Sequence, residues 1–161
     1  MSLATIRPPG AQVLDAPAGQ TILVVEDQPE VLQLLGDALG MLGYRVLTAG
    51  GPSQGLALGD QHSREIDLVL TDVVMPEMNG PEFVRQLTVR YPSLRVLYVS
   101  GHGADILQPL GVPVDGPPIL KKPFTIDTLR ERVTGALEMS AASVGAVAPP
   151  AGAAPTSRGL R

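Results

Sequence analysis

The sequence predicts an α/β fold, in which the strands of a parallel sheet alternate with helices that cover both faces. Two observations support this prediction. Short runs rich in valine, isoleucine and leucine alternate along residues 21–139 with segments whose apolar positions repeat with the helical period. The short runs are apolar almost throughout, as expected for strands that are buried on both faces.

The first strand and the first helix have the strongest patterns. Thr21–Val25 is an uninterrupted run rich in β-branched residues. Residues 29–42 carry an apolar stripe at helical spacing, which we expect to face the core: Val31, Leu34, Leu35, Ala38, Leu39 and Leu42. Pro29 suits the first turn of this helix, and Gly43 suits its C-terminal end.

The remaining elements follow the same alternation. We expect strands at Arg45–Thr48, Asp67–Thr71, Leu94–Ser100 and Ile119–Leu120. A small helix is expected at Pro52–Leu58, and a longer one at Pro81–Arg90 with its core face formed by Phe83, Val84 and Leu87. Thr125 is expected to cap a last helix that buries Ile126, Leu129, Val133 and Leu137.

Residues 101–118 contain four prolines and four glycines, so a fourth helix there is expected to be short or partly unwound. Five strand–helix units fit a flavodoxin-like, doubly wound (βα)5 fold, a three-layer sandwich with the parallel strand order 2-1-3-4-5. In such sheets the functional crevice lies at the carboxyl ends of the strands.

The two ends of the chain differ from the middle. Residues 1–20 and 140–161 are rich in proline, glycine and alanine and lack a sustained period. We expect a flexible N-terminal tail or linker, a folded domain at 21–139 and a low-complexity C-terminal tail, with no output domain.

Composition excludes several classes of function. The chain has no cysteine, which rules out disulfides, thiol nucleophiles and cysteine-bound metals, and two histidines are too few for a histidine-rich zinc site. A net charge of −4 without a basic cluster argues against direct nucleic-acid binding. No apolar run reaches membrane-spanning length and no signal-peptide pattern is present, so we expect a soluble, cytoplasmic protein.

Chemically active side chains follow the predicted strands. Glu26 and Asp27 come after the first strand, Asp72 after the third, Ser100 ends the fourth, and Lys122 follows the fifth. Three carboxylates packed closely repel one another unless a cation neutralises them, and a set of oxygen ligands suits Mg²⁺. A carboxylate beside Mg²⁺ can attack phosphorus and form an acyl phosphate, with the ammonium and the hydroxyl stabilising the phosphoryl oxygens.

With these residues in place, the chain resembles a response regulator receiver domain of two-component and phosphorelay signalling, in the style found in hybrid sensor histidine kinases. Four stretches carry the resemblance, in the family's order and spacing: ILVVEDQPEV at 22–31, LVLTDVVMPEMNGPEF at 68–83, VLYVSGH at 96–102 and LKKPF at 120–124. The similar region covers about three quarters of the chain.

The resemblance implies a role for each strand-end residue. Asp72 would be the phosphoryl acceptor, and Asp27 would bind Mg²⁺ directly. Glu26 would bind the ion through water, and the Val74 backbone carbonyl would complete the protein's share of the metal site. Ser100 would hydrogen-bond the phosphoryl group and report its presence by moving.

The remaining positions also follow from the resemblance. Lys122, rather than the exposed Lys121, takes the role of the family's lysine because it directly precedes Pro123, and this peptide bond is typically cis in the family. His102 is at a variable position where side chains can affect the lifetime of the phosphoryl group. Of the residues without an expected role, His62 lies in a helix-to-strand connection, and Met75 and Met78 are expected to pack.

The implied function is phosphoryl transfer from the phosphohistidine of a histidine kinase or histidine phosphotransfer protein, followed by an altered surface that a downstream protein recognises. Such a domain is not an enzyme in the usual sense, although it phosphorylates and dephosphorylates itself. It is either free-standing or the receiver domain of a hybrid sensor histidine kinase. The resemblance also leaves open a homodimer. A pseudo-receiver that works without phosphorylation is the third alternative.

Other classes fit less well. A haloacid-dehalogenase-like phosphatase needs a second aspartate two residues after its nucleophile, where this chain has Val74. A flavodoxin needs a serine- and threonine-rich phosphate loop after the first strand, and this chain has none there. A P-loop nucleotidase is excluded because its phosphate-binding motif is absent from the sequence.

One departure from the family concerns the switch. Many receivers have an aromatic residue three positions before the site lysine, and its rotation couples phosphorylation to the output face; here that position is Ile119. We therefore expect phosphorylation to order the irregular segment 101–118 instead of rotating an aromatic side chain.

Overall fold

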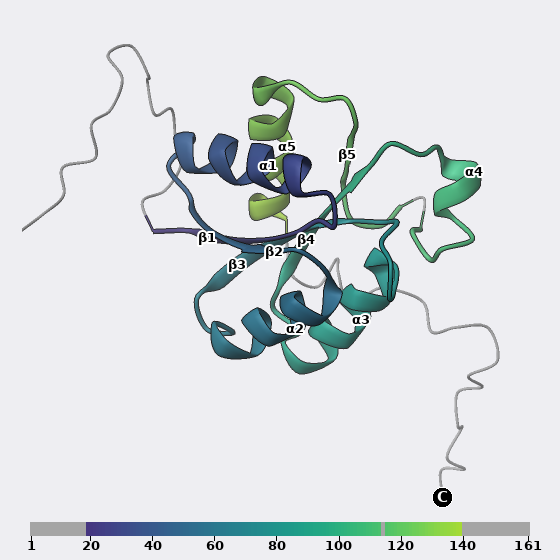
Figure 1. The fold of residues 1–161 in the computed structure, drawn as a ribbon, viewed down its shortest axis with the longest axis horizontal. Coiled ribbons are helices and arrows are strands. Elements are labelled where there is room, and N and C mark those ends of the chain that lie inside the picture. Colours follow the sequence, from purple (N-terminus) through teal and green to yellow (C-terminus); the bar gives the residue numbers. More distant parts are fainter. Residues whose placement is uncertain (1–18, 114, 140–161) are drawn as a thin grey trace, which may run out of the picture.

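The computed structural model describes residues 19–113 and 115–139, and it contains one five-stranded parallel sheet (Figure 1). The strands are β1 (Thr21–Val25), β2 (Arg45–Ala49), β3 (Ile66–Asp72), β4 (Arg95–Ser100) and β5 (Ile119–Lys121). Their order in the sheet is β2-β1-β3-β4-β5, which confirms the predicted doubly wound fold. The predictions for residues 1–18 and 140–161 lie outside the described residues.

Helices cover both faces of the sheet, as Figure 1 shows. On one face lie α1 (Pro29–Met41) and α5 (Ile126–Glu138), and on the other lie α2 (Pro52–Gln61) and α3 (Gly80–Arg90). The single turn α4 (Ala104–Leu107) lies to one side of the sheet, at the right of Figure 1. In the part of the chain that the structure describes, no helix has the length and apolarity needed to cross a membrane.

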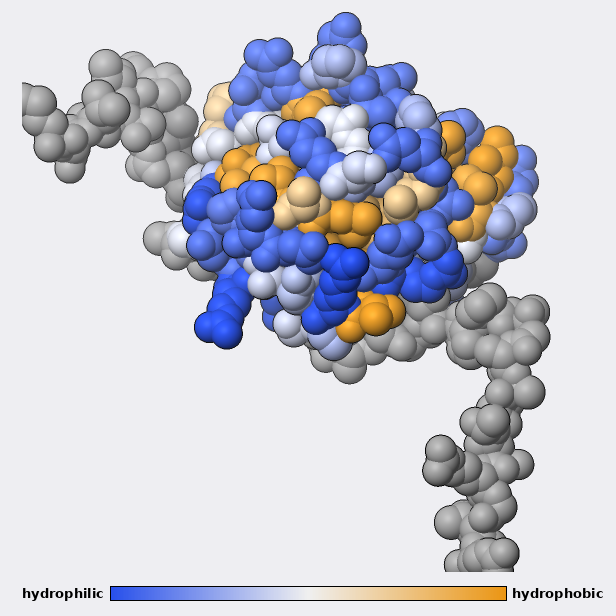
Figure 2. Space-filling view, turned by 60° about the horizontal axis from the view of Figure 1, so that its bottom comes forward, coloured by the Kyte–Doolittle hydropathy of each residue, from blue (hydrophilic) through white to orange (hydrophobic). Residues whose placement is uncertain are grey.

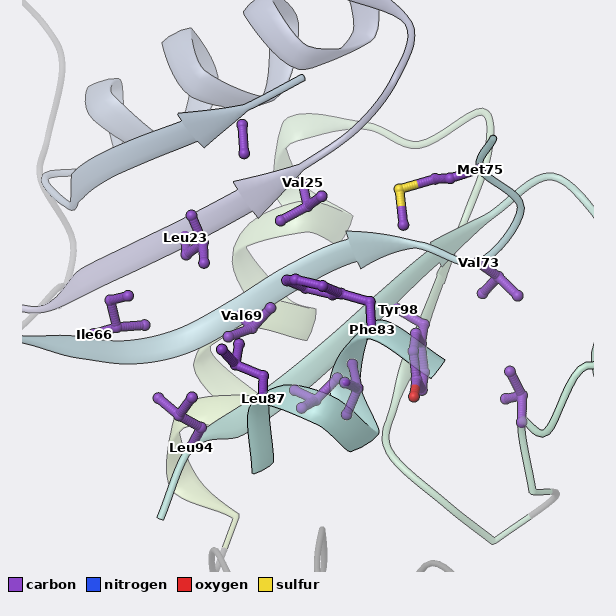
Figure 3. Close-up of a cluster of buried hydrophobic side chains, with 14 of the residues drawn as sticks. Leu23, Val25, Ile66, Val69, Val73, Met75, Phe83, Leu87, Leu94 and Tyr98 are labelled. Atoms are coloured by element: carbon purple, nitrogen blue, oxygen red, sulfur yellow. The ribbon is translucent and has the colours of Figure 1, made fainter. Parts of the chain in front are cut away.

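The sheet separates two apolar clusters, because successive side chains of a strand point to opposite faces. Leu23 and Val25 of β1 belong to the cluster under α2 and α3, part of which is drawn in Figure 3, whereas Ile22 and Val24 belong to the cluster under α1 and α5. All four side chains are fully buried. This burial on both sides explains why β1 has a continuous apolar sequence.

Two side chains predicted to lie in the core do not. Leu34 on α1 is 57% exposed and Ile126 on α5 is 50% exposed, so both predictions were wrong. Leu34 lies at the margin of the apolar stripe, whose centre is formed by the buried Leu35 and Leu39. Ile126 is the first residue of its helix and lies beyond the part that packs on the sheet, which begins with Leu129.

The helix α2 is three residues longer than predicted, and glycine explains the difference. A side-chain carbon added to Gly55 would lie 2.9 Å from the Phe83 ring, and one added to Gly59 would lie 2.6 Å from Leu87. The two glycines therefore allow α2 to pack closely against α3. They also weaken the apolar pattern of α2, which is why its last three residues, 59–61, were not predicted.

Candidate functional site

The carboxyl ends of the strands place the predicted site residues at one edge of the sheet. Asp72 is the last residue of β3 and Ser100 the last of β4, and Asp72 is aligned with the residue just before Ser100. Glu26 and Asp27 follow β1 directly, and Lys122 follows β5. The sheet therefore brings the five side-chain positions together, as the sequence predicted.

Three carboxylates form a compact acidic cluster at this edge. Each of Glu26, Asp27 and Asp72 offers an oxygen, and these oxygens all lie within 4.8 Å of one another. Glu26 is only 1% exposed and Asp72 8% exposed, while Asp27 is partly exposed. Oxygen donors grouped in this way fit a hard divalent cation, for which Mg²⁺ is the expected ion.

Lys122 supplies positive charge to two of the three carboxylates. Its ammonium nitrogen donates to Glu26 Oε2 at 3.1 Å and to Asp72 Oδ2 at 3.3 Å. Its backbone N–H donates to the Ser100 carbonyl at 2.9 Å, which joins the ends of β4 and β5. The Lys122–Pro123 bond is cis and Lys121 is exposed, so both predictions are confirmed.

The charged groups of this cluster shift one another's pKa values. Burial raises the pKa of Glu26 above its ordinary value, and the nearby Asp72 carboxylate adds to the rise, although Gln28 and Lys122 oppose it. Burial disfavours the charged form of Lys122, but Asp72 and Glu26 outweigh this effect and raise the pKa of its ammonium. The lysine is therefore held in its charged form between the two carboxylates.

Backbone groups fix the Asp72 carboxylate and the loop that follows it. Asp72 Oδ1 accepts from the Val73 N–H at 2.8 Å, and the Val73 carbonyl accepts from the Gly80 N–H at 2.8 Å. A side-chain carbon added to Gly80 would lie 2.4 Å from the Asp72 carbonyl oxygen, so only glycine fits here. Asn79 caps α3 by accepting from the Glu82 N–H at 2.9 Å.

The site opens into a hollow of about 540 Å³ beside Asp72. The hollow is lined by Asp27, Gln28, Asp72, Val74, Met75, Pro76, Gly101, His102 and Lys122. Glu26 and Ser100 do not line it, because both side chains are buried. His102 and Val74 therefore flank the approach to the acceptor, while Ser100 is buried beneath the surface.

Ser100 has a partner that the sequence did not reveal. Its hydroxyl accepts from the His102 N–H at 3.0 Å, and Glu26 Oε1 accepts from the Gln28 N–H at 3.2 Å. Backbone donors leave no signal in a sequence, so neither bond could be predicted from residue types. In both bonds, the backbone two residues further along the chain holds the side chain of a site residue.

The residues without an expected role have structural contacts. The His62 ring nitrogen Nδ1 lies 3.1 Å from Glu65 Oε2, in the exposed connection between α2 and β3. Met75 is buried in the cluster under α2 and α3, and Met78 packs against that cluster, which confirms the packing role expected for both methionines.

Comparison with known proteins agrees with this architecture. The family model described as response regulator receiver domain matches residues 22–134. The sensor kinase CckA of Brucella abortus (strain 2308) is 34% identical over 125 residues, which cover 77% of this chain and 13% of that protein. The chain spans half or less of the length of the curated relatives compared with it.

Solved structures show the same fold. The receiver domain of the hybrid histidine kinase CckA aligns with a TM-score of 0.62 and 30% identity, over 73% of this chain and 99% of that one. The chemotaxis protein CheY4 of Vibrio cholerae aligns with a TM-score of 0.67 and 27% identity, over 74% of this chain and 99% of that one.

Receiver domains are the signalling domains of two-component systems. They accept a phosphoryl group, bind Mg²⁺ at an acidic site and interact with histidine kinases or phosphotransfer proteins, and in general they are not enzymes. This chain has an acidic cluster at its strand ends, formed by Glu26, Asp27 and Asp72. Since the family match covers well over half of its residues, the chain belongs to the response regulator receiver domain family.

Proposed function

We propose that Asp72 accepts a phosphoryl group from a phosphohistidine of a histidine kinase or histidine phosphotransfer protein. The observation that supports this proposal best is the position of its carboxylate. It lies in an acidic cluster with Glu26 and Asp27, within hydrogen-bonding distance of Lys122, and it lines an open hollow.

In the proposed transfer, one carboxylate oxygen of Asp72 attacks the phosphorus atom. A P–O bond forms, the P–N bond to the histidine ring breaks, and the ring nitrogen keeps the electron pair. The product is an acyl phosphate on Asp72. The Val73 N–H, 2.8 Å from Asp72 Oδ1, keeps the carboxylate oriented toward the end of the sheet.

The chain's own charges prepare the site for this step. The Lys122 ammonium contacts Asp72 in the unphosphorylated protein and would shift to an oxygen of the incoming phosphoryl group. Ser100 would donate its hydroxyl proton to a second phosphoryl oxygen. His102 and Val74 line the hollow through which water reaches the acyl phosphate, so their side chains would influence its lifetime.

The acidic cluster fits a magnesium ion. Asp27, Asp72 and the Val74 carbonyl would hold it directly, and Glu26 would hold it through water. When bound, the cation supplies the positive charge that compensates the carboxylates and the phosphoryl oxygens. We further propose that residues 21–139 form the receiver domain, either free-standing or as part of a hybrid sensor kinase, and that they signal to a downstream protein.

The proposal is tested by incubating the protein with Mg²⁺ and acetyl phosphate and measuring its intact mass. We expect one phosphoryl adduct that disappears when Mg²⁺ is chelated and is absent from Asp72→Asn. Asp67→Asn is the matched control, because Asp67 lies near the opposite end of the same strand, where it accepts from the Thr21 N–H. An adduct that persists in Asp72→Asn would contradict the proposal, as would a folded wild-type protein that acquires none.

A further inference from the structure

Two residues of β4 hold the irregular segment 101–118 at both of its ends. The His102 N–H near the start of the segment donates to the Ser100 hydroxyl at 3.0 Å. The Pro118 carbonyl at its end accepts from the Tyr98 N–H at 3.0 Å. The segment is therefore bonded to the residue expected to contact the phosphoryl group and to a residue two positions earlier on the same strand.

The middle of the segment is attached through the apolar cluster that contains Tyr98. Tyr98 is 2% exposed and lies in the cluster under α2 and α3, where Figure 3 shows its ring. Leu107 and Val112 are buried in the same cluster, whereas most other described side chains of the segment are exposed. Apolar contact within this cluster is thus what attaches the middle of the segment to the domain.

Tyr98 is placed to respond to Ser100. Side chains two residues apart on a strand lie on the same face of the sheet, so Tyr98 and Ser100 face the same side. Ile119 is aligned with Tyr98 on β5 and packs against the same cluster. The aromatic ring at this edge therefore lies on β4, one strand away from the position where many receivers carry it.

We propose that Tyr98 couples Ser100 to the segment 101–118, so that phosphorylation orders this segment against the Tyr98 ring. When Ser100 turns toward a phosphoryl group on Asp72, its bond to the His102 N–H moves the start of the segment. The Tyr98 ring holds the middle of the segment, and the Tyr98 N–H holds its end. The displacement of the start therefore changes the conformation of the residues between these attachments. This inference rests on the proposed phosphorylation of Asp72.

The hydroxyl of Tyr98 is not required for this role. Burial raises the pKa of Tyr98 well above its ordinary value, so the side chain stays neutral across the physiological range. The coupling depends on the shape and packing of the ring. A phenylalanine at this position should therefore preserve the coupling, and a leucine should not.

The test is amide hydrogen exchange over residues 101–118, measured on the full chain with and without Mg²⁺ and acetyl phosphate. In the wild type we expect phosphorylation to slow exchange in this segment. Tyr98→Phe should keep this difference and Tyr98→Leu should lose most of it, while both are phosphorylated as fully as the wild type by intact mass. Tyr44→Leu is the matched control, because Tyr44 is a buried tyrosine in the cluster on the opposite face.

A second variant protects the test against misfolding. If Tyr98→Leu does not fold, Val112→Ala weakens the same attachment from the side of the segment and should also reduce the difference in exchange. The inference is overturned if Tyr98→Leu, or Val112→Ala in its place, retains the full difference, or if Tyr98→Phe or Tyr44→Leu loses it. A wild type that is phosphorylated without any change in exchange overturns the inference alone, whereas a wild type that is not phosphorylated overturns the proposed function as well.

Discussion

Two stretches of chain leave the sheet beside the acidic cluster, and they are built differently. The loop 73–79 after β3 leads directly into α3, and Val73 and Met75 are buried within it. Its ends are closed by the bond from Gly80 to Val73. The segment 101–118 after β4 is longer. Among its described residues, 101–113 and 115–118, the only helix is the single turn α4, and most of these residues are exposed.

The difference indicates that the two stretches have different roles at the same edge of the sheet. The loop 73–79 fixes the acceptor, because its Val73 N–H holds the Asp72 carboxylate. Gly80, which follows the loop, approaches the Asp72 carbonyl more closely than any side chain would allow. The segment 101–118 has few buried groups and therefore changes its conformation at low cost. Figure 2, which brings the side of α2 and α3 forward, shows apolar side chains in patches between polar ones.

The largest effect is expected from a methyl group added at Gly80, where the loop 73–79 joins α3. Gly80→Ala would place a carbon 2.4 Å from the Asp72 carbonyl oxygen, so we expect a loss of about 3 kcal/mol in the free energy of unfolding. Chemical denaturation measures this change. In the control Gly135→Ala, the added carbon meets no atom within 4 Å in an exposed part of α5, and stability should rise. Equal stability of Gly80→Ala and the wild type would show that the loop is not tightly packed.

The acidic cluster should make stability depend on Mg²⁺. A ligand that binds only the folded state at 100 times its dissociation constant stabilises that state by about 2.7 kcal/mol. We therefore expect the melting temperature to rise when EDTA is replaced by saturating Mg²⁺. Most of the rise should disappear in Asp27→Asn and remain in Asp37→Asn, an exposed carboxylate on α1. A full rise in Asp27→Asn would remove Asp27 from the metal site.

A smaller effect is expected when the same methyl group is added to the longer segment. Gly111 has a φ of +101°, which side chains rarely adopt, but the nearest atom to an added carbon is 3.4 Å away on Pro81. Gly111→Ala should therefore cost about 1 kcal/mol from backbone strain alone, less than Gly80→Ala. Denaturation of the two variants side by side measures the difference. A larger loss for Gly111→Ala would reverse the proposed contrast between the two stretches.

The smallest effect concerns pH. Because burial and Asp72 raise the pKa of Glu26, the folded protein binds its proton more tightly than the unfolded chain does. Glu26 should therefore add stability as the pH falls through this raised pKa toward the ordinary glutamate value, and this gain should be lost as the pH rises. Denaturation in EDTA at several pH values, compared between the wild type and Glu26→Gln, isolates the contribution. An identical pH dependence in the two proteins would show that Glu26 is not perturbed.

Most of the fold could be predicted because buried parallel strands and amphipathic helices have different periods. The periods did not reveal how wide a buried stripe is, which is why Leu34 and Ile126 were misplaced. They also failed where glycine replaces apolar side chains, as at the C-terminal end of α2. There, close helix packing depends on the absence of a side chain, and the absence of a side chain adds nothing to a hydrophobic pattern.

The site was predictable to the level of which residues meet. The carboxyl ends of neighbouring parallel strands lie at the same edge of a sheet. The sequence alone therefore predicted that Glu26, Asp72 and Lys122 lie close together. Which atoms pair could not be predicted, because the bonds to Ser100 and to Glu26 come from backbone N–H groups. The position of Tyr98 opposite Ile119 depends on the register of β4 and β5, which neither sequence pattern determines by itself.

The most direct test of the central claim is to locate the phosphoryl group. The protein is phosphorylated with acetyl phosphate and Mg²⁺, the acyl phosphate is reduced with borohydride, and the peptides are sequenced by mass spectrometry. The account predicts a reduced residue at position 72 that forms only when Mg²⁺ is present. Reduction at another carboxylate, or at position 72 without Mg²⁺, would contradict it.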